Sequence, residues 1–398
     1  MQKIVLFIFL IGLAETGCTQ SVSEKNIKQD IVRLSSDAFE GRGTGSAGGE
    51  KAAEYLESQF KKIGLATSSN PFTFKGGMHG TGKEGATRNI IAFLDNQAKT
   101  TIIIGAHYDH LGLGNDGNSL DPDPKNKIHN GADDNASGVA GILELARYFK
   151  KNEIRNANLL FLAFSGEELG LYGSKYWTEH PTIDLNQVNY MINLDMIGRY
   201  ESSKGLAVSG TGTAPVWEPL LKSLSSEKLI IKTDSSGVGP SDHTSFYLKN
   251  IPVLHFFTGS HNDYHKPGDD WDKINYQAEA EILRLIIKVI EAPQTEDKLA
   301  FLTTKNKSMT PRSSFKVTMG VMPSYTAEVV GLRVDGVSEG KPAQRAGILA
   351  GDIIIKLGDY EVKNIETYME ALGQFDKGQT VTVQVKRGAE VKNLTVTF

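Results

Sequence analysis

Four almost entirely apolar segments, separated by segments with helical periodicity, are the feature of this 398-residue sequence that most restricts its fold. The apolar segments are predicted to be buried strands, and they span residues 100–110, 158–165, 188–195 and 251–259. The segments with apolar residues at helical spacing span residues 47–63, 135–151 and 276–292. Apolar strands that alternate with helices predict an α/β fold: a mostly parallel, mixed sheet covered by helices on both faces.

Charged and imidazole side chains follow three of these apolar segments directly. His107 and Asp109 come at the end of the first, Glu167 and Glu168 after the second, and Asp195 after the third. In such sheets the ligand site lies beyond the carboxyl ends of the strands, so we expect these side chains at one edge. Adjacent glutamates both ionise easily only beside a positive charge. The sequence therefore predicts a bound cation at this edge.

The candidate ligands of that cation combine imidazoles with carboxylates. They are His107, Asp109, Asp133, Asp134, Glu167, Glu168, Asp195 and His265. This mixture suits Zn²⁺ or a similar cation, whereas Ca²⁺ prefers oxygen ligands alone. The carboxylates exceed what one zinc needs, and two metals bridged by one aspartate would use them. One glutamate could then bind metal while its neighbour handles protons.

Each motif taken alone also has a purely structural explanation. Asp133 and Asp134 could stabilise a helix N-terminus, Glu167 and Glu168 could form a solvated turn, and Asp195 could cap a strand end. The motifs occur together, most of them at the end of an apolar segment, and this favours a common site.

Composition excludes several classes of partner and fold. The net charge of −4 gives no reason to expect nucleic acid or an anionic membrane surface as partner. The single cysteine, Cys18, excludes a disulfide-stapled fold.

The first 18 residues have the features of an export signal. A lysine precedes an apolar run from Ile4 to Ala14, which is too short to span a bilayer comfortably, and small residues follow. We therefore expect export to the bacterial periplasm or cell envelope. Cys18 lies where a lipoprotein carries its acylated cysteine, although Glu15 departs from that signal. Either Cys18 is a lipid anchor, or a secretory signal is cleaved nearby and Cys18 is discarded.

The motif set resembles the M28 family of zinc metallopeptidases, the two-zinc aminopeptidases and their relatives. The motifs are "AHYDH", "DNASG", "SGEELG", "NLDMIG" and "DYHKPGD", preceded by "FEGRGTGSAGGEKAAEYLESQFKKIGL". We assign residues 22–293 to this domain. The resemblance implies two zinc ions per chain. His107 and Asp195 would hold one and Glu168 and His265 the other, while Asp134 would bridge both. It also implies a cis peptide bond between Asp134 and Asn135.

The same resemblance implies catalytic roles for three residues. Glu167 would take the proton of a water molecule between the metals and return it to the departing amine. Asp109 would orient the ring of His107 as a hydrogen-bond acceptor. Tyr264 would polarise the scissile carbonyl, and the alternative for Tyr264 is a tyrosine packed in the core.

Three further segments leave alternatives open. Asp242 and His243 in "PSDHTSF" either support the site or belong to an ordinary turn. His261 is either an alternative ligand or a residue on the rim of the site, and we favour the rim. The long loop at residues 111–130 is expected to form a wall of the substrate cleft.

The C-terminal part of the chain has a different character. Residues 294–314 are polar without a sustained period and are interpreted as a linker, and residues 315–398 hold short β-rich pieces. The latter resemble a PDZ domain, chiefly through "PAQRAGILAGDIIIKLGD". Such domains bind an extended peptide at a sheet edge. The stretch "GVMPSY" lacks the usual form of the carboxylate-binding loop, and the alternative is a folded appendage without a ligand.

Three hypotheses for function follow. The first is an exported two-zinc metallopeptidase, an aminopeptidase acting on peptides. The second is a glutaminyl-cyclase-like acyltransferase, an activity found on the same scaffold, normally with one zinc. The third is a catalytically silent envelope protein that binds a peptide or protein through its PDZ domain. The complete ligand set and Glu167 favour the first.

Overall fold

The computed structural model describes most of the chain outside the predicted signal peptide. The described residues are 21–75, 84–116, 118–152, 154, 156–292, 298–304, 317–323, 329–337, 340–363 and 365–398. The prediction for residues 1–18, including Cys18, lies outside them. Among the described helices, none combines the length and the apolar composition needed to cross a membrane.

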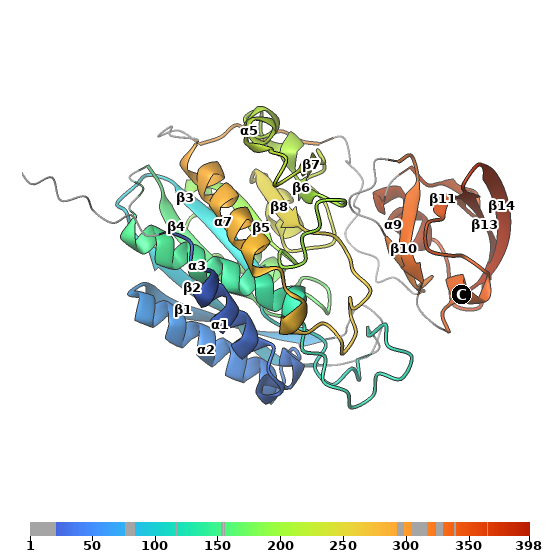
Figure 1. Cartoon of the computed structure of the whole chain (residues 1–398), viewed down its shortest axis with the longest axis horizontal. Coiled ribbons are helices and arrows are strands. Elements are labelled where there is room, and N and C mark those ends of the chain that lie inside the picture. Colours follow the sequence, from blue (N-terminus) through green and yellow to red (C-terminus); the bar gives the residue numbers. More distant parts are fainter. Residues whose placement is uncertain are drawn as a thin grey trace, which may run out of the picture.

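The larger of two sheets has the strand order β1-β2-β4-β3-β5-β8-β6-β7 (Figure 1). Its strands are β1 (Ala66–Lys75), β2 (Glu84–Leu94), β3 (Thr101–His107), β4 (Asn158–Phe164), β5 (Val188–Leu194), β6 (Leu206–Ser209), β7 (Ile231–Thr233) and β8 (Val253–Phe257). The central strands β4, β3, β5 and β8 are parallel, whereas β2 and β6 pair antiparallel with them. Every residue of these four central strands is buried. The predicted mostly parallel, mixed sheet is thus confirmed.

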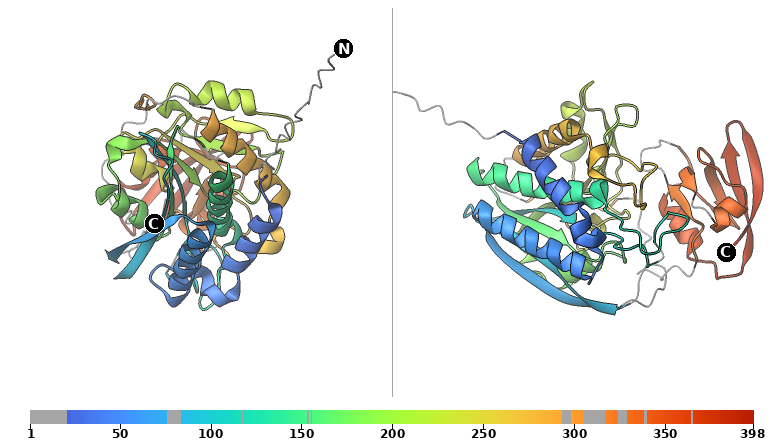
Figure 2. Two further views of the ribbon diagram at one scale, coloured as in Figure 1. Left: turned by 90° about the vertical axis from the view of Figure 1, so that its left-hand side faces the viewer. Right: turned by 60° about the horizontal axis from the view of Figure 1, so that its bottom comes forward.

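Helices cover both faces of this sheet, as predicted. They are α1 (Glu24–Leu34), α2 (Ala47–Ile63), α3 (Gly138–Lys151), α4 (Tyr172–Glu179), α5 (Trp217–Leu224), α6 (His243–Tyr247) and α7 (Tyr276–Glu291). Successive strand residues point to opposite faces. Ile102 and Ile104 of β3 accordingly pack with α1, α2, α3 and α7, while Ile103 packs with α4 and α6. Figure 2 shows the first group together on one side of the sheet.

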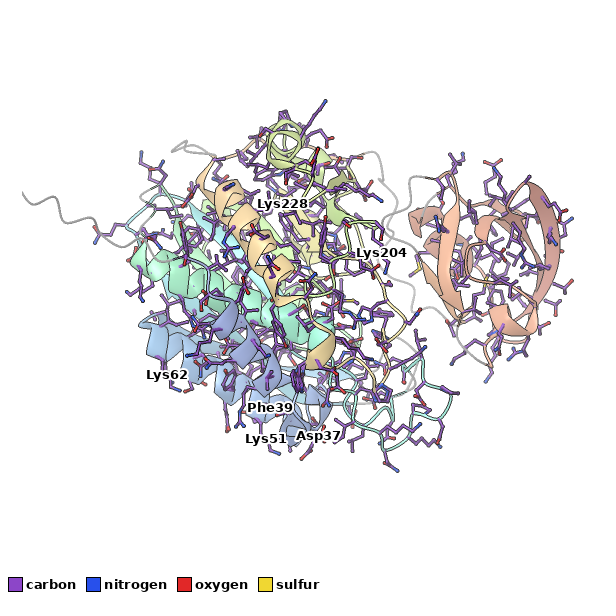
Figure 3. All side chains as sticks on the ribbon, in the orientation of Figure 1. Asp37, Phe39, Lys51, Lys62, Lys204 and Lys228 are labelled. Carbon is purple, nitrogen blue, oxygen red and sulfur yellow. The ribbon has the colours of Figure 1, made fainter. Side chains whose placement is uncertain are left out.

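Helix α2 shows how local sequence sets the bounds of an element. The Ser46 side chain accepts a hydrogen bond from the Gly49 N–H at the start, and Gly64 ends the helix with a left-handed backbone (φ 86°). Leu56 is buried against the sheet, whereas Lys51 and Lys62 point outward from the body of the domain (Figure 3). The predicted helix at residues 47–63 is confirmed.

Four strands were not predicted from the sequence. β1 and β2 form an antiparallel pair at one edge, and β6 and β7 lie at the other. β1 is largely exposed and polar, and β7 has no fully buried residue, so neither has the apolar run that identifies the central strands.

The C-terminal domain has its own sheet and core. Its strands are β9 (Val321–Pro323), β10 (Leu332–Val337), β11 (Ile353–Leu357), β12 (Tyr360–Glu361), β13 (Thr380–Arg387) and β14 (Glu390–Thr397), and its helices are α8 (Pro342–Arg345) and α9 (Ile365–Leu372). The sheet order is β14-β13-β11-β10-β9, with β12 beside β11. Its buried apolar residues, including Ile354, Val383 and Val385, form a separate cluster. This β-rich second domain agrees with the prediction.

Part of the predicted linker packs on the first domain. Of residues 294–314 the structure describes 298–304. The N–H of Leu302 donates to the carbonyl of Thr213 (2.8 Å), and the N–H of Thr304 donates to the hydroxyl of Tyr247 (3.0 Å). Thr304 is buried, and the Phe301 ring contacts that of Tyr247. These described residues are therefore anchored rather than free.

Candidate metal centre and active site

The carboxyl ends of three parallel strands bring the predicted residues together. β3 ends at His107, the turn after β4 carries Glu167 and Glu168, and Asp195 follows β5. The other residues come from two loops. Asp134 lies in a distorted turn (Ala132–Ser137) before α3, and His265 lies in the loop after β8. The expected convergence at one sheet edge is observed.

Asp134 lies between two pairs of donor groups. Its Oδ1 atom is 3.5 Å from Nε2 of His107, which is 3.4 Å from Oδ1 of Asp195. Its Oδ2 atom is 3.2 Å from Nε2 of His265, which is also 3.2 Å from Oε2 of Glu168. Zinc bonds of about 2.0–2.1 Å at tetrahedral angles place neighbouring donor atoms about 3.3 Å apart. The donors therefore fit two zinc ions that share the Asp134 carboxylate.

The backbone around Asp134 is held by hydrogen bonds. The peptide bond between Asp134 and Asn135 is cis, as the resemblance implied. Oδ2 of Asp269 accepts from the N–H groups of both Asp133 and Asp134 (3.0 Å each). Gly131 has φ 57°, and a Cβ there would lie 2.2 Å from the carbonyl oxygen of Asp134. A side chain at residue 131 would therefore displace the backbone of Asp134 and with it the carboxylate of that residue.

Both predicted imidazole ligands have their second nitrogen occupied by a backbone carbonyl. Nδ1 of His265 donates to the carbonyl of Asn118 (2.9 Å), and Nδ1 of His107 donates to that of Asp109 (3.1 Å). These bonds place the proton on Nδ1 and leave Nε2 free to bind metal. The N–H of Leu120 also donates to the backbone carbonyl of His265 (2.9 Å). Residues 118–120 of the predicted wall loop thus hold His265 in place.

The role predicted for Asp109 needs a correction. Its carboxylate is 3.9 Å from Nδ1 of His107, so the backbone carbonyl of Asp109 orients that ring instead. The carboxylate accepts from the hydroxyl of Thr44 (2.7 Å) and from the N–H of Glu167 (3.2 Å). Asp109 therefore positions the turn that carries both glutamates, while its backbone carbonyl, the nearer acceptor, holds the ring of His107.

His110 is a site residue that the sequence analysis missed. Its Nδ1 atom lies 2.8 Å from Oε1 of Glu168 and 3.8 Å from Oδ2 of Asp134. The donor atoms of His110, Asp134 and Glu168 all lie within 4.8 Å of one another. The short contact with Glu168 is typical of a hydrogen bond, whereas His265 is equally far from both carboxylates. We therefore keep His265 as the better ligand. His110 is the second histidine of the motif "AHYDH", and this position could have identified it as a site residue from the sequence.

The adjacent glutamates differ in their surroundings. Burial raises the pKa of Glu167 well above its usual value; His107 opposes this, and Asp242 and Glu168 add to it. Burial acts in the same direction on Glu168, but His265 and His110 outweigh it and hold its pKa well below the usual range. Two carboxyl groups with such separated pKa values suit different tasks. The Glu168 carboxylate is ionised and suited to bind a metal, and Glu167 is suited to exchange a proton.

A sequence model of peptidase family M28 matches residues 89–290, half of the chain. The chain belongs to peptidase family M28. A PDZ domain model matches residues 305–398. Both resemblances drawn from the motifs are thereby confirmed.

Relatives of this M28 chain include YfbL and fungal proteins named leucine aminopeptidases. YfbL of Escherichia coli, described as uncharacterized, is 26% identical over 328 residues, which are 72% of this chain and 96% of YfbL. Leucine aminopeptidase 2 of Arthroderma otae is 27% identical over 228 residues, which are 49% of this chain. The chain spans 45% of that relative's length.

Solved structures share the fold of the M28 domain. A Zn-dependent exopeptidase from Parabacteroides distasonis matches with a TM-score of 0.57 and 18% identity, covering 69% of this chain and 99% of that chain. A glutaminyl cyclase from Porphyromonas gingivalis matches with a TM-score of 0.58 and 19% identity, covering 69% and 99%. At these identities the likeness establishes the fold alone.

A cavity opens beside the metal donors of the M28 domain. Its remaining lining residues are Met196, Pro240, Ser241, His255, Phe257, Ser260 and Tyr264, together with Glu167. Tyr264 stacks on the ring of His265, with centroids 3.9 Å apart, and packs against the apolar residues of the wall. Tyr264 thus lines the cavity at the predicted place.

The residues with open alternatives fall into two groups. Asp242 and His243 are fully buried at the start of α6. Asp242 is close enough to raise the pKa of Glu167, and the His243 ring stacks on that of His255 in the cavity lining, so both support the site. His261 lies 3.2 Å from Oδ2 of Asp133 and is buried, so it is neither a ligand nor a rim residue. Asp133 itself accepts from the N–H of Gly198 (2.7 Å).

Arg42 was also missed by the sequence analysis. It is fully buried, and it donates to four backbone carbonyls, those of Tyr108, Leu34, Asn130 and Gly131, at 2.6–2.8 Å. Burial lowers its pKa to about 10, while Asp134 and other carboxylates oppose that shift. The cation therefore ties the end of β3 to the loop before Asp134. Its position in the motif "FEGRG", which was part of the family resemblance, could have identified it from the sequence.

Proposed function

We propose that this protein is a zinc-dependent aminopeptidase that holds two zinc ions and hydrolyses the first peptide bond of peptides. The observation that carries the proposal is the Asp134 carboxylate, whose two oxygens each face a separate histidine–carboxylate pair at 3.2–3.5 Å. Zinc bound there would acidify a water molecule and polarise the scissile carbonyl.

The chain's own residues supply proton transfer and positioning. Glu167 lines the cavity and takes the proton of the attacking water, then returns it to the departing amine. Tyr264 lines the same cavity and donates to the developing oxyanion. Asp109 holds the backbone of Glu167 in place. A free amine at the substrate N-terminus would be stabilised by the carboxylates of Asp195 and Glu167, which favours an aminopeptidase.

Zinc content and products test this proposal. We expect two zinc ions per full chain by plasma mass spectrometry, and release of the leaving group from aminoacyl amidomethylcoumarins but not from their N-acetylated forms. A chelator should abolish turnover, and zinc should restore it. Glu227→Gln, at an exposed glutamate, is the control for the Glu167→Gln variant and should behave like the wild type.

Other outcomes of the same experiment would support the alternatives. One tightly bound zinc with loss of ammonia from glutaminyl peptides would favour a glutaminyl-cyclase-like acyltransferase. Two zinc ions with no turnover of any substrate would favour a silent envelope protein whose PDZ domain carries the function. Either result would overturn the aminopeptidase proposal.

We also propose that residues 1–18 direct export to the periplasm or cell envelope. The apolar run before Cys18 supports this proposal. Cell fractionation should place the wild type outside the cytoplasm, and a cytoplasmic full-length chain would contradict it. Labelling with radioactive palmitate distinguishes a lipid anchor, which Cys18→Ser would abolish, from a cleaved secretory signal.

For the C-terminal domain we propose binding of an extended peptide or protein segment at its sheet edge. The PDZ family match supports this. Binding of a random C-terminal peptide library to the full chain should enrich one sequence class, and absence of any enrichment would favour an appendage without a ligand.

A further inference from the structure

The cavity is lined by three apolar side chains, Met196, Pro240 and Phe257, and by two polar rings that are not predicted ligands, those of Tyr264 and His255. Met196 and Phe257 are buried in one apolar cluster, against which Tyr264 packs. His255, from the middle of β8, lines the same cavity. The His255 ring, beside these apolar side chains, is positioned to contact a substrate side chain. Buried polar groups discriminate between substrates more sharply than apolar surface does, because a substrate that cannot pair with them leaves them without a partner.

A hydrogen-bond chain determines which nitrogen of His255 carries the proton. The hydroxyl of Ser241 donates to Oδ2 of Asp195 (2.6 Å), so its oxygen accepts from the Asn193 amide (2.8 Å). The Nδ2 group of Asn193 therefore faces both Ser241 and Nδ1 of His255 (3.1 Å). An amide nitrogen only donates, so Nδ1 of His255 is the acceptor and the proton of the neutral ring is on Nε2.

Stacking holds the ring in one orientation. The rings of His255 and His243 are nearly parallel, with centroids 4.4 Å apart and planes at 10°. Nε2 of His255 has no hydrogen-bond partner in the described part of the chain, and it is not among the fully buried unpartnered atoms there. The Nε2–H group therefore reaches the cavity as a neutral donor that lacks an acceptor.

The charges at this position limit the acceptor to a neutral one. No lysine or arginine is among the described residues that line the cavity, whereas Asp195 lies beside Ser241 and Glu167 lines the wall. Four carboxylates line the cavity, those of Asp134, Glu167, Glu168 and Asp195, and together they balance the charge of the two zinc ions proposed there. A carboxylate at the tip of a substrate side chain would therefore meet a neutral donor and no uncompensated cation. An amide carbonyl would accept the same hydrogen bond without that cost.

We propose that His255 selects peptides whose first residue has an apolar stem and a neutral acceptor at its tip, above all glutamine, by donating Nε2–H to that acceptor. This inference deepens the proposed aminopeptidase function and rests on it. Leucine fits the apolar walls but leaves the donor unpaired, and glutamate brings an unpaired charge.

The test compares glutaminyl, leucyl and glutamyl amidomethylcoumarins with the zinc-loaded full chain. We expect the wild type to prefer glutamine, and we expect His255→Met to lower the ratio of kcat/KM for glutamine over leucine about tenfold. His255→Gln keeps a donor and should retain part of the preference. His180→Met, at an exposed histidine that does not line the cavity, is the control. An unchanged ratio in His255→Met, with wild-type Tm and zinc content, would overturn the inference.

A binding measurement separates this inference from the proposed hydrolysis. Calorimetry with free L-glutamine and L-leucine reports the pocket without turnover. If the wild type cleaves no substrate but binds L-glutamine more tightly, and His255→Met loses that difference, the pocket inference stands and the aminopeptidase proposal fails. If L-leucine binds as well as L-glutamine, the pocket inference fails whatever the activity. If His255→Met does not fold, His255→Gln decides alone: loss of the whole preference despite its donor would count against the inference.

Discussion

His107 and His265 lie on opposite sides of one carboxylate: Nε2 of His107 is 3.5 Å from Oδ1 of Asp134, and Nε2 of His265 is 3.2 Å from Oδ2. His107 ends a central strand, whereas His265 comes from a loop that follows the last central strand. The site is therefore assembled by the whole sheet edge, and its parts can be tested one at a time.

Replacing Glu167 by Gln should remove turnover without removing metal. The amide keeps the size of the side chain but cannot accept and return a proton, so we expect kcat to fall about 10²–10⁴-fold. Zinc content by plasma mass spectrometry should stay at the wild-type value. A variant with near-normal kcat would show that Glu167 is not the proton carrier.

Asp134→Asn should lower the metal content itself. An amide supplies one neutral oxygen where the wild type supplies two charged ones, so the shared ligand of the two donor groups is lost. We expect fewer than two zinc ions per chain together with loss of activity. Asp359→Asn, at an exposed aspartate of the C-terminal domain, should keep full zinc content. Two tightly bound zinc ions in Asp134→Asn would contradict the bridging role.

Arg42→Met should destabilise the first domain. The change removes the Arg42 donor from four carbonyls, of which that of Gly131 keeps the N–H of Ala136 (3.2 Å). Each buried acceptor left unsatisfied costs about 1–3 kcal/mol. After partial relaxation we expect a loss of about 3 kcal/mol or more, seen as a lower Tm by calorimetry. Arg33→Met, at an exposed arginine of α1, is the matched control. Equal Tm values for the two variants would show that Arg42 does not stabilise the domain by joining the end of β3 to the loop before Asp134.

Acid should loosen the C-terminal domain through Asp352. Burial opposes ionisation of Asp352, but a bidentate pair with Arg387 (2.7 Å to each oxygen) and the N–H of Leu349 lower its pKa. A lowered pKa in the folded state means that the pair stabilises above the ordinary aspartate pKa and that this stability is lost as the pH falls through the lowered value.

Hydrogen exchange on the full chain measures this effect. Protection of amides in β11 and β13 should fall from pH 5 to pH 3 after correction for intrinsic rates. Asp352→Asn should show low protection at both pH values, so its pH dependence should be smaller. Protection in the wild type that does not change over this range would contradict the role of the pair.

The limits of sequence reasoning are visible at particular residues. The central strands and α2 were predicted because burial leaves a local pattern in the sequence. A strand buried on both faces is a continuous apolar run, and a helix buried on one face has apolar residues at helical spacing. β1 and β7 were missed because edge strands need no such run. The ligands were found because their motifs resemble a known family in which each follows a recognisable segment.

The sequence by itself determined the α/β class, the two domains and the set of candidate metal-binding side chains, since these depend on local periodicity and on motifs. Only the tertiary structure decided the partners of those side chains. Asp109 proved to hold Glu167 rather than His107, Arg42 and His110 entered the site, and Asn193 set the proton on His255. Such contacts join segments far apart in the chain, and hydrogen bonds form according to distance and direction in the folded molecule, which no local pattern encodes.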